Sequence, residues 1–328
     1  MTAGHAPRSG DLLLARVGRV GQHKRLERPD GRRAQLFAGD HVVVAYGQRY
    51  APDQFGGVLP PDLGRCALVA AGGIAAQEQC RHRAVSAPTV LEPVGLLADG
   101  EGHVLNLMRY ALNRPGQVAE HRQIPALAVF GNSMNVGKTT TVARLALGLT
   151  RAGRRVACVK VTGTGAGGDY WMMRDAGAVW VGDFTDMGHA TTVSLSAEHL
   201  EAVATGLIGH AGETSPDVIL VEVADGLLQR ETALLADSPA LRDRVDGILF
   251  AGADAMSTLG GVAMLRQRGH RVLGVSGAFT AAPLAMAEVA AHVDVPVLEK
   301  TDLSDPSQAM ALLDAATEVR SDETAQAV

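Results

Sequence analysis

The stretch that most constrains the fold is residues 126–152, where an apolar run is followed by a glycine-containing loop and a helical pattern. Residues 126–130 are short and apolar, as a buried parallel strand requires, and apolar side chains recur at helical spacing over residues 139–152. Gly153 ends that helix. Between strand and helix, consecutive backbone N–H groups must turn toward one place, and the helix adds the positive end of its dipole there. The stretch therefore predicts a strand–loop–helix unit that binds a phosphate.

The side chains of this loop have distinct expected roles. Lys138 reaches the terminal phosphates as a point charge, and the Thr139 hydroxyl ligates Mg²⁺. Five residues separate Gly131 from Gly137, where the usual phosphate loop has four, so Asn132 takes the position of the first glycine. The alternative is a glycine-containing turn with an incidental lysine. The residues predicted to bind the nucleotide are Asn132, Ser133, Met134, Asn135, Val136, Gly137, Lys138, Thr139 and Thr140.

Composition and charge narrow the class of protein. The net charge is −5 with dispersed basic residues, which argues against a nucleic-acid-binding surface. Cys66, Cys80 and Cys158 are too few and too scattered for a disulfide framework or a paired zinc site. The chain has no secretory leader pattern and no apolar run long enough to span a bilayer. We therefore expect a cytoplasmic protein that contacts neither nucleic acid nor membrane.

The pattern changes near residue 124. Before it, short apolar runs at 12–20, 41–46, 66–71, 93–97 and 103–107 predict a β-rich domain, a small barrel or a mixed sheet, with loops at 50–57 and 70–73. After it, branched-chain runs at 155–161, 217–223, 247–251, 271–275 and 295–298 alternate with helical segments, as in a doubly wound, mostly parallel α/β sheet. The expected organisation is a disordered segment 1–10, a β-rich domain 11–115, a linker 116–123, a phosphate-loop α/β domain 124–318 and a disordered tail 319–328.

Charged residues at the ends of two predicted strands complete the expected site, because parallel sheets bind ligands at the carboxyl ends of their strands. Lys160 ends the second strand of the α/β domain, where its ammonium can neutralise charge on a phosphoryl group. Glu222 and then Asp225 are the candidates for a further Mg²⁺ contact after the third strand. A carboxylate in an apolar strand is costly unless it pairs or binds a cation.

Residues 167–192 hold both tryptophans and several charged side chains, which suits a substrate pocket or a lid. A short helix over 169–176 that places Trp171 and Met172 in the core is the alternative. Asp169 and His189 lie beside glycines and are candidate catalytic residues, with His189 as a general base.

Three motifs resemble those of the dethiobiotin synthetase family, in the SIMIBI class of P-loop NTPases. They are the loop spacing that ends in Val136-Gly-Lys-Thr139, the run Lys160-Val-Thr-Gly-Thr-Gly165, and the run Val221-Glu-Val-Ala-Asp-Gly-Leu-Leu228. The resemblance covers roughly residues 124–300. It implies Mg-ATP binding with Lys138, Lys160, Thr139 and Glu222 near the γ-phosphate, and a homodimer by analogy.

The chain also departs from that family. Ser133 stands where the family has an acidic residue, Val223 replaces a glycine, and the N-terminal domain has no counterpart. Biotin synthesis is therefore not expected.

From these features we predict an ATP- and Mg²⁺-dependent enzyme of ligase or kinase type that activates a small, carboxylate-bearing substrate by phosphoryl transfer. Its catalytic residues would be Lys138, Lys160, Asp169 and His189, and Thr139, Glu222 and Asp225 would hold the metal. Two alternatives stay open: a nucleotide-binding switch or carrier protein, and an acyltransferase that uses the loop to hold coenzyme A.

Overall fold

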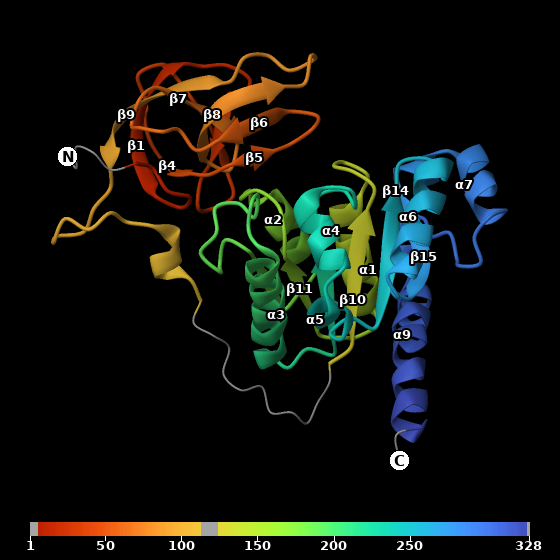
Figure 1. Cartoon of the computed structure of the whole chain (residues 1–328). Coiled ribbons are helices and arrows are strands. Elements are labelled where there is room, and N and C mark those ends of the chain that lie inside the picture. The colour runs from red at the N-terminus through yellow and green to blue at the C-terminus, as the bar shows by residue number, and fades with distance from the viewer. Residues whose placement is uncertain (1–5, 113–123, 327–328) are drawn as a thin grey trace. The chain divides into compact units, whose positions relative to one another are not determined.

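The computed structural model describes residues 6–112 and 124–326, which form two compact units (Figure 1). The first unit comprises the described residues up to 112 together with Gly163–Gly168 and Phe184–Ser194. The second holds the remaining described residues from 124 onward. The predicted linker 116–123 lies outside the described residues. We describe each unit by itself.

The first unit is built on a small closed barrel. Strands β4 (His41–Tyr46), β1 (Leu12–Arg19), β9 (Thr89–Leu96), β7 (Cys66–Ala70) and β8 (Ile74–Arg81) pair in that order, and a parallel pairing of β4 with β8 closes the ring. β6 (Phe55–Val58) and β5 (Arg49–Tyr50) extend the sheet beyond β8, and β2 (Arg25–Glu27) pairs with β3 (Arg33–Gln35) in a separate hairpin. Leu13, Ala15 and Val17 alternate inward along β1 and pack in the core with Tyr46 and Leu68.

The two segments from later in the chain are integral to this unit. Gly165 N–H donates to the Ala190 carbonyl at 2.9 Å, and Ala190 is buried among core residues of β4, β7 and β8. A Cβ on Gly72 would lie 1.9 Å from the Gly165 carbonyl oxygen, so only glycine permits this approach. The predicted loop 70–73 thus includes a position where the backbone of residue 165 approaches closely.

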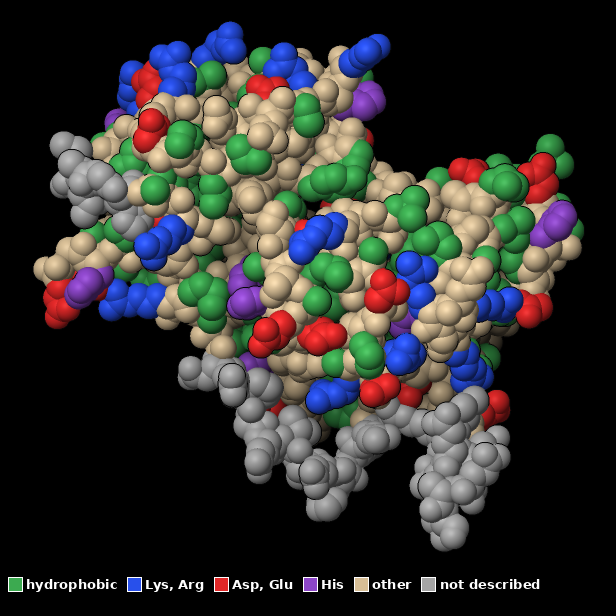
Figure 2. All heavy atoms as spheres, in the orientation of Figure 1, with side chains coloured by type: hydrophobic (Ala, Val, Ile, Leu, Met, Phe, Trp, Pro, Cys, Tyr) green, Lys and Arg blue, Asp and Glu red, His purple; other side chains and the backbone are tan. Residues whose placement is uncertain are grey.

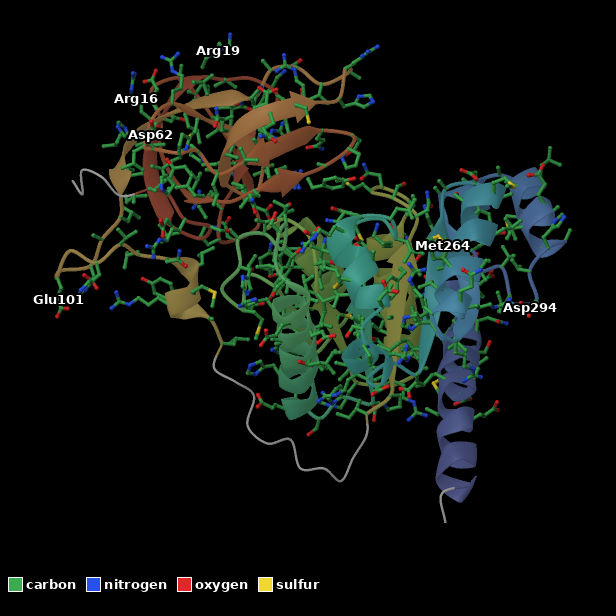
Figure 3. All side chains as sticks on the ribbon, in the orientation of Figure 1. Arg16, Arg19, Asp62, Glu101, Met264 and Asp294 are labelled. Atoms are coloured by element: carbon green, nitrogen blue, oxygen red, sulfur yellow. The ribbon has the colours of Figure 1, made fainter. Side chains whose placement is uncertain are left out.

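Several charged side chains of the first unit pair with an opposite charge. Arg16 and Arg65 pair with Glu92, and Arg28 pairs with Asp30. On the face drawn in Figure 2, Lys and Arg side chains lie among Asp and Glu side chains. Arg16 and Arg19 point away from the barrel (Figure 3); Arg16 follows the alternation of β1, whereas Arg19 lies beyond an irregularity in the pairing of β1 with β9 after Val17.

Several expectations for the first unit change. The run 103–107 is not a strand: Val104 makes an isolated bridge to Ala98, and a 3₁₀ helix, η1 (Leu107–Tyr110), follows with Asn106 as its N-cap. The predicted loop 50–57 contains β5 and the start of β6, because Phe55 is a core residue. Residues 6–10 are ordered rather than disordered, since Gly10 N–H donates to the Tyr46 carbonyl at 2.8 Å.

The second unit is a six-stranded parallel sheet in the order β12-β11-β13-β10-β14-β15. Nearly every strand residue is buried, which requires cover on both faces. The doubly wound α/β class predicted from sequence is thus confirmed. The strands are β10 (Ala126–Gly131), β11 (Val156–Lys160), β12 (Trp180–Asp183), β13 (Val218–Glu222), β14 (Gly247–Gly252) and β15 (Val272–Gly277).

Helices provide that cover. α1, α8 and α9 pack together, and α3 packs with α4 and α5, while α6 and α7 pack with each other (Figure 1). The bounds are α1 (Lys138–Arg151), α2 (Gly168–Asp175), α3 (Ala197–Glu213), α4 (Arg230–Ala236), α5 (Pro239–Arg242), α6 (Ala255–Gln267), η2 (Ala278–Ala281), α7 (Pro283–Ala290), α8 (Lys300–Ser304) and α9 (Pro306–Gln326). No helix in the described ranges is long and apolar enough to cross a membrane.

Four differences from the sequence prediction affect this unit. The run 295–298 forms only an isolated bridge, Val275 with Val297, and β12 was missed inside the predicted lid. The helix over 169–176 exists as α2, but its buried residue is Met173, whereas Trp171 and Met172 are 39% and 43% exposed. α9 continues to Gln326, where the sequence predicted a disordered tail from 319, because helix-forming residues dominate that stretch.

Candidate nucleotide-binding site

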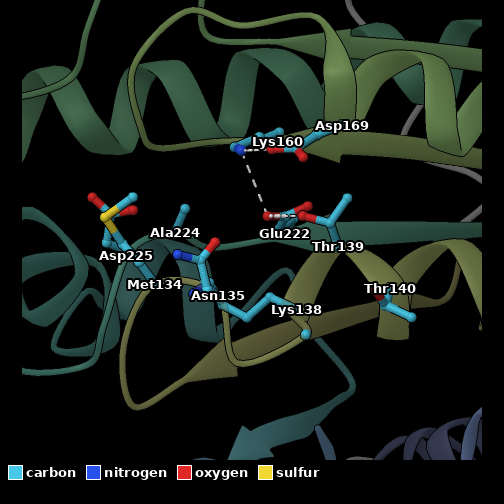
Figure 4. Close-up of a pocket in the computed structure, with 11 residues that line it drawn as sticks. Met134, Asn135, Lys138, Thr139, Thr140, Lys160, Asp169, Glu222, Ala224 and Asp225 are labelled. Carbon is cyan, nitrogen blue, oxygen red and sulfur yellow. Dashed lines mark hydrogen bonds and ion pairs between the residues drawn. The ribbon is translucent and has the colours of Figure 1, made fainter. Parts of the chain in front are cut away.

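The phosphate loop joins β10 to α1 as predicted. Asn135 has φ 59° and Gly137 has φ 100°, so the chain turns in the left-handed region before α1 begins at Lys138. Such a turn points backbone N–H groups at one concavity, next to the positive end of the α1 dipole. The pocket there has a volume of about 280 Å³. Its lining residues, drawn in Figure 4, are Met134, Asn135, Gly137, Lys138, Thr139, Thr140, Lys160, Asp169, Glu222, Ala224 and Asp225.

Lys138 is held inside the loop. Its side chain is 6% exposed, and Nζ donates to the Ser133 carbonyl at 2.7 Å. Burial lowers the pKa of Lys138, although the carboxylates of Glu222 and Asp225 oppose that shift. To reach a phosphate, the ammonium must therefore exchange the Ser133 carbonyl for phosphate oxygens.

Asn132 holds the loop in place and does not line the pocket. Its Oδ1 accepts from the Ala253 N–H at 2.9 Å, which ties the loop to the segment after β14. Neither Asn132 nor Ser133 lines the pocket, whereas Val136 lines an adjoining hollow described below. The other six residues predicted to bind the nucleotide do line the pocket.

Glu222, the last residue of β13, provides the carboxylate expected for a metal. Thr139 Oγ1 donates to Glu222 Oε1 at 3.0 Å, so the two predicted Mg²⁺ ligands already touch. Glu222 is 1% exposed, and its Oε2 has no hydrogen-bond partner in the described part of the chain. A buried oxygen of this kind is costly unless a cation or proton satisfies it.

The remaining metal coordination would have to come from elsewhere. The described residues contain no group of three or more His, Cys, Asp or Glu side chains that could hold a metal alone. A hydroxyl and a carboxylate, completed by phosphate oxygens and water, fit Mg²⁺.

Lys160 links two carboxylates across the pocket. Its Nζ forms an ion pair with Asp169 in the first turn of α2 and lies 3.6 Å from Glu222 Oε1 (Figure 4). Burial alone would lower the pKa of Lys160, but Glu222 and Asp169 outweigh it and raise that pKa. Burial raises the pKa of Glu222, and Lys160 and Lys138 oppose the shift. Lys160 therefore stays charged, and Glu222 is ready to exchange a proton for a metal ion.

The segment after β13 runs against the phosphate loop. Leu227 N–H donates to the Gly131 carbonyl at 2.8 Å, and a Cβ on Gly226 would lie 2.4 Å from the Asn132 carbonyl oxygen. Thr162 and Thr232 both donate hydroxyl hydrogen bonds to the Ala224 carbonyl. These contacts place Asp225 at the pocket. Gly226 lies within the run 221–228 that the sequence singled out, directly after Asp225, but it was given no role there.

A second hollow, of about 170 Å³, adjoins the first and shares Asn135, Gly137 and Thr140 with it. It continues between α1 and the end of β15, where Ala278 N–H donates to the Val136 carbonyl at 2.9 Å. Its other lining residues are Val136, Thr141, Ser276, Gly277, Ala278, Lys300 and Leu303. Sequence reasoning missed Lys300; its place just after the last apolar run was the available signal.

The structure brings Lys138, Thr139, Lys160, Asp169, Glu222 and Asp225 to one pocket. His189 does not line it, because residues 184–194 belong to the first unit. The general-base role of His189 stays a prediction.

Comparisons with known proteins add the following. No family model matches this chain. No curated protein matches it either. The signal recognition particle receptor FtsY from Elizabethkingia anophelis matches at 16% sequence identity and a TM-score of 0.40, over 66% of this chain and 75% of that one. The chloroplast FtsY from Physcomitrella patens matches at 19% identity and a TM-score of 0.42, over 64% of this chain and 70% of that one. The signal recognition particle 54 kDa protein from Aeropyrum pernix K1, in complex with GDP, matches at 16% identity and a TM-score of 0.37, over 65% of this chain and 53% of that one.

These comparisons correct part of the sequence prediction. The matched structures are P-loop proteins of the SIMIBI class, as expected, but membership of the dethiobiotin synthetase family is not shown. The prediction of an ATP-dependent ligase or kinase is wrong, because the matched proteins are signal recognition proteins. ATP in particular is not shown to be the nucleotide. A P-loop nucleotide-binding domain is what remains.

Proposed function

We propose that this chain is a Mg²⁺-dependent nucleotide switch that binds a nucleoside triphosphate at the phosphate loop and resets by slow hydrolysis. The observation that carries the proposal is the position of Lys160, which pairs with Asp169 on α2 and lies 3.6 Å from Glu222 at the metal position. One ammonium thus joins the nucleotide site to the first turn of α2. A switch needs a local charge change and an element with two arrangements.

The residues have defined parts in this proposal. The loop amides and Lys138 hold the phosphates, and Thr139 with Glu222 holds Mg²⁺. An incoming triphosphate attracts Lys160 and repels the Asp169 carboxylate, so the ion pair that anchors the start of α2 weakens. Loss of the γ-phosphate restores the pair. Helix α2 would therefore differ in position between the triphosphate and diphosphate states.

The assembly and the compartment are also proposed. A homodimer is proposed by analogy with the family that the motifs resemble. Sedimentation of the purified chain would test that state. The three cysteines are free thiols, which is consistent with the reducing cytoplasm.

The test is nucleotide binding and hydrolysis by the full chain, with ATP and GTP compared directly, each with and without Mg²⁺. We expect Mg²⁺-dependent binding and slow hydrolysis without any added small molecule. Lys138→Ala should abolish both, because no other ammonium arises from the loop itself. Lys24→Ala, which removes an exposed lysine of the first unit, is the matched control. Unchanged hydrolysis by Lys138→Ala would refute the site, and hydrolysis that requires a small-molecule acceptor would refute the switch.

A further inference from the structure

Two arginines on α1 flank the place where α8 packs. Arg144 and Arg151 are seven residues apart, two helical turns, so they share one side of the helix with Gly148 between them. A Cβ on Gly148 would lie 2.4 Å from the Leu303 carbonyl oxygen, so the glycine lets the backbone of α8 approach α1 closely. Lys300, the first residue of α8, joins the two arginines around one hollow of about 380 Å³.

The charge of this hollow is unbalanced. Its other lining residues are Thr301, Ser304, Asp305 and Pro306, so three cations face one carboxylate. Asp305 is committed to α9, since its Oδ1 accepts from the N–H groups of Ser307 and Gln308 at 2.9 and 3.1 Å. The nearby carboxylate of Asp302 accepts from the Glu299 N–H at 2.8 Å. Three cations thus share one carboxylate, one oxygen of which already accepts two backbone N–H groups, so the hollow keeps an excess of positive charge.

The cations themselves are available. Arg151 donates to the Ser304 carbonyl at 3.4 Å, a long contact that leaves most of its guanidinium unused. Arg144 and Lys300 form no side-chain hydrogen bond or ion pair with any described residue. Three cations beside one carboxylate leave an excess of positive charge, and two guanidinium groups with an ammonium suit a doubly charged oxyanion.

Lys300 connects this hollow to the neighbourhood of the nucleotide site. It lines both this hollow and the second hollow, and the second hollow shares Asn135, Gly137 and Thr140 with the phosphate-loop pocket. A ligand whose phosphates lie on the loop and whose nucleoside extends past Gly277 would therefore approach Lys300.

We propose that Arg144, Arg151 and Lys300 bind a phosphoryl group additional to those on the phosphate loop. The group has two possible sources. It is either a second phosphate on the ribose of the bound nucleotide or a separate phosphate ion beside it. The proposal concerns different residues from the switch and does not require hydrolysis.

The experiment is calorimetric titration of the full chain with five probes: adenosine 5′-monophosphate, adenosine 3′,5′-bisphosphate, their two guanosine counterparts, and inorganic phosphate. The variant is Arg144→Gln with Arg151→Gln, whose side chains are both exposed, so the fold should be kept. Arg154→Gln, an exposed arginine just beyond α1 that does not line the hollow, is the control. A melting curve checks that each variant is folded.

If the phosphate belongs to the nucleotide, the bisphosphates should bind at least about tenfold more tightly than the monophosphates, since charge-assisted contacts of this kind are worth one decade or more. The double variant should lose that advantage and Arg154→Gln should keep it. If the phosphate is separate, Lys138→Ala protein should still bind inorganic phosphate, and the double variant should bind it at least about tenfold more weakly. Equal binding of all probes by the wild type and the double variant would overturn the proposal. Lys138→Ala protein that no longer binds nucleotide but still binds inorganic phosphate would confirm the phosphate-loop site and this second site independently of each other.

Discussion

Replacement of Gly148 by alanine sets two known effects against each other. An alanine inside a helix is more favourable than glycine by about 1 kcal/mol. In α1, however, the new Cβ would lie 2.4 Å from the Leu303 carbonyl oxygen and 2.8 Å from the Ala309 Cβ. Ordinary carbon–oxygen contacts begin near ~3.3 Å, so α8 would have to move by about 1 Å. Backbone shifts in a packed core cost about 1–3 kcal/mol, occasionally more.

The steric cost of the new Cβ should exceed the gain in helix propensity. We expect Gly148→Ala to destabilise the second unit by about 1–2 kcal/mol, or roughly 2–8 °C in melting temperature for a unit of this size. Because α8 carries Lys300, nucleotide affinity should fall as well. Urea unfolding followed by helical circular dichroism measures the first quantity, and calorimetry measures the second.

Gly260→Ala is the matched control. Gly260 is also inside a helix, α6, but a Cβ there would meet no atom within 4 Å. That variant should gain up to about 1 kcal/mol from helix propensity alone. The reasoning would be refuted if Gly148→Ala were as stable as Gly260→Ala.

Two further predictions concern the charged pocket. Mg²⁺ and a proton compete for the Glu222 carboxylate, and burial raises the pKa of that carboxyl above its usual value of 4.5. The affinity for Mg²⁺ should therefore increase as the pH rises through the raised pKa. In Glu222→Gln the affinity for Mg²⁺ should not depend on pH. Without metal, the same group's contribution to stability is present below 4.5 and is lost as pH rises through the folded-state pKa, which melting curves at several pH values would detect. Asp169→Asn should bind the triphosphate roughly 3- to 10-fold more tightly, because the variant removes a negative charge that repels the phosphates. Asp175→Asn, at the far end of α2, is the control and should bind the triphosphate as the wild type does. Weaker binding by Asp169→Asn would contradict the proposed switch.

The phosphate-loop site was predictable because its signals are local. The apolar run, the glycine spacing and the helical pattern around Lys138 occur within one short stretch, and Lys160 and Glu222 each end a recognisable strand. Parallel strands bring such ends to one edge, so the pocket followed from the pattern alone.

The features that were missed depend on tertiary context. β8 carries polar residues at its exposed end, and β12 is only four residues long. Neither sequence therefore shows a clear alternation of apolar and polar residues that would predict a strand. The run 295–298 is apolar but pairs only through Val297 with Val275, and no local signal separates such a bridge from a strand. Lys300 became part of a site only through the packing of α8 on Gly148, which pairs residues far apart in sequence.

The composition of the first unit has a consequence for biosynthesis. Its core includes Ala190, and its turn at Gly72 packs on Gly165, so residues made much later complete it. At a translation rate of about 5–20 residues per second, the ribosome needs roughly 4–16 s to add the stretch between residues 112 and 194. Domains usually fold in the order in which they are synthesised. Here the barrel made first must wait for part of the second half of the chain, and a nascent chain halted before residue 163 would expose apolar surface that the finished protein covers.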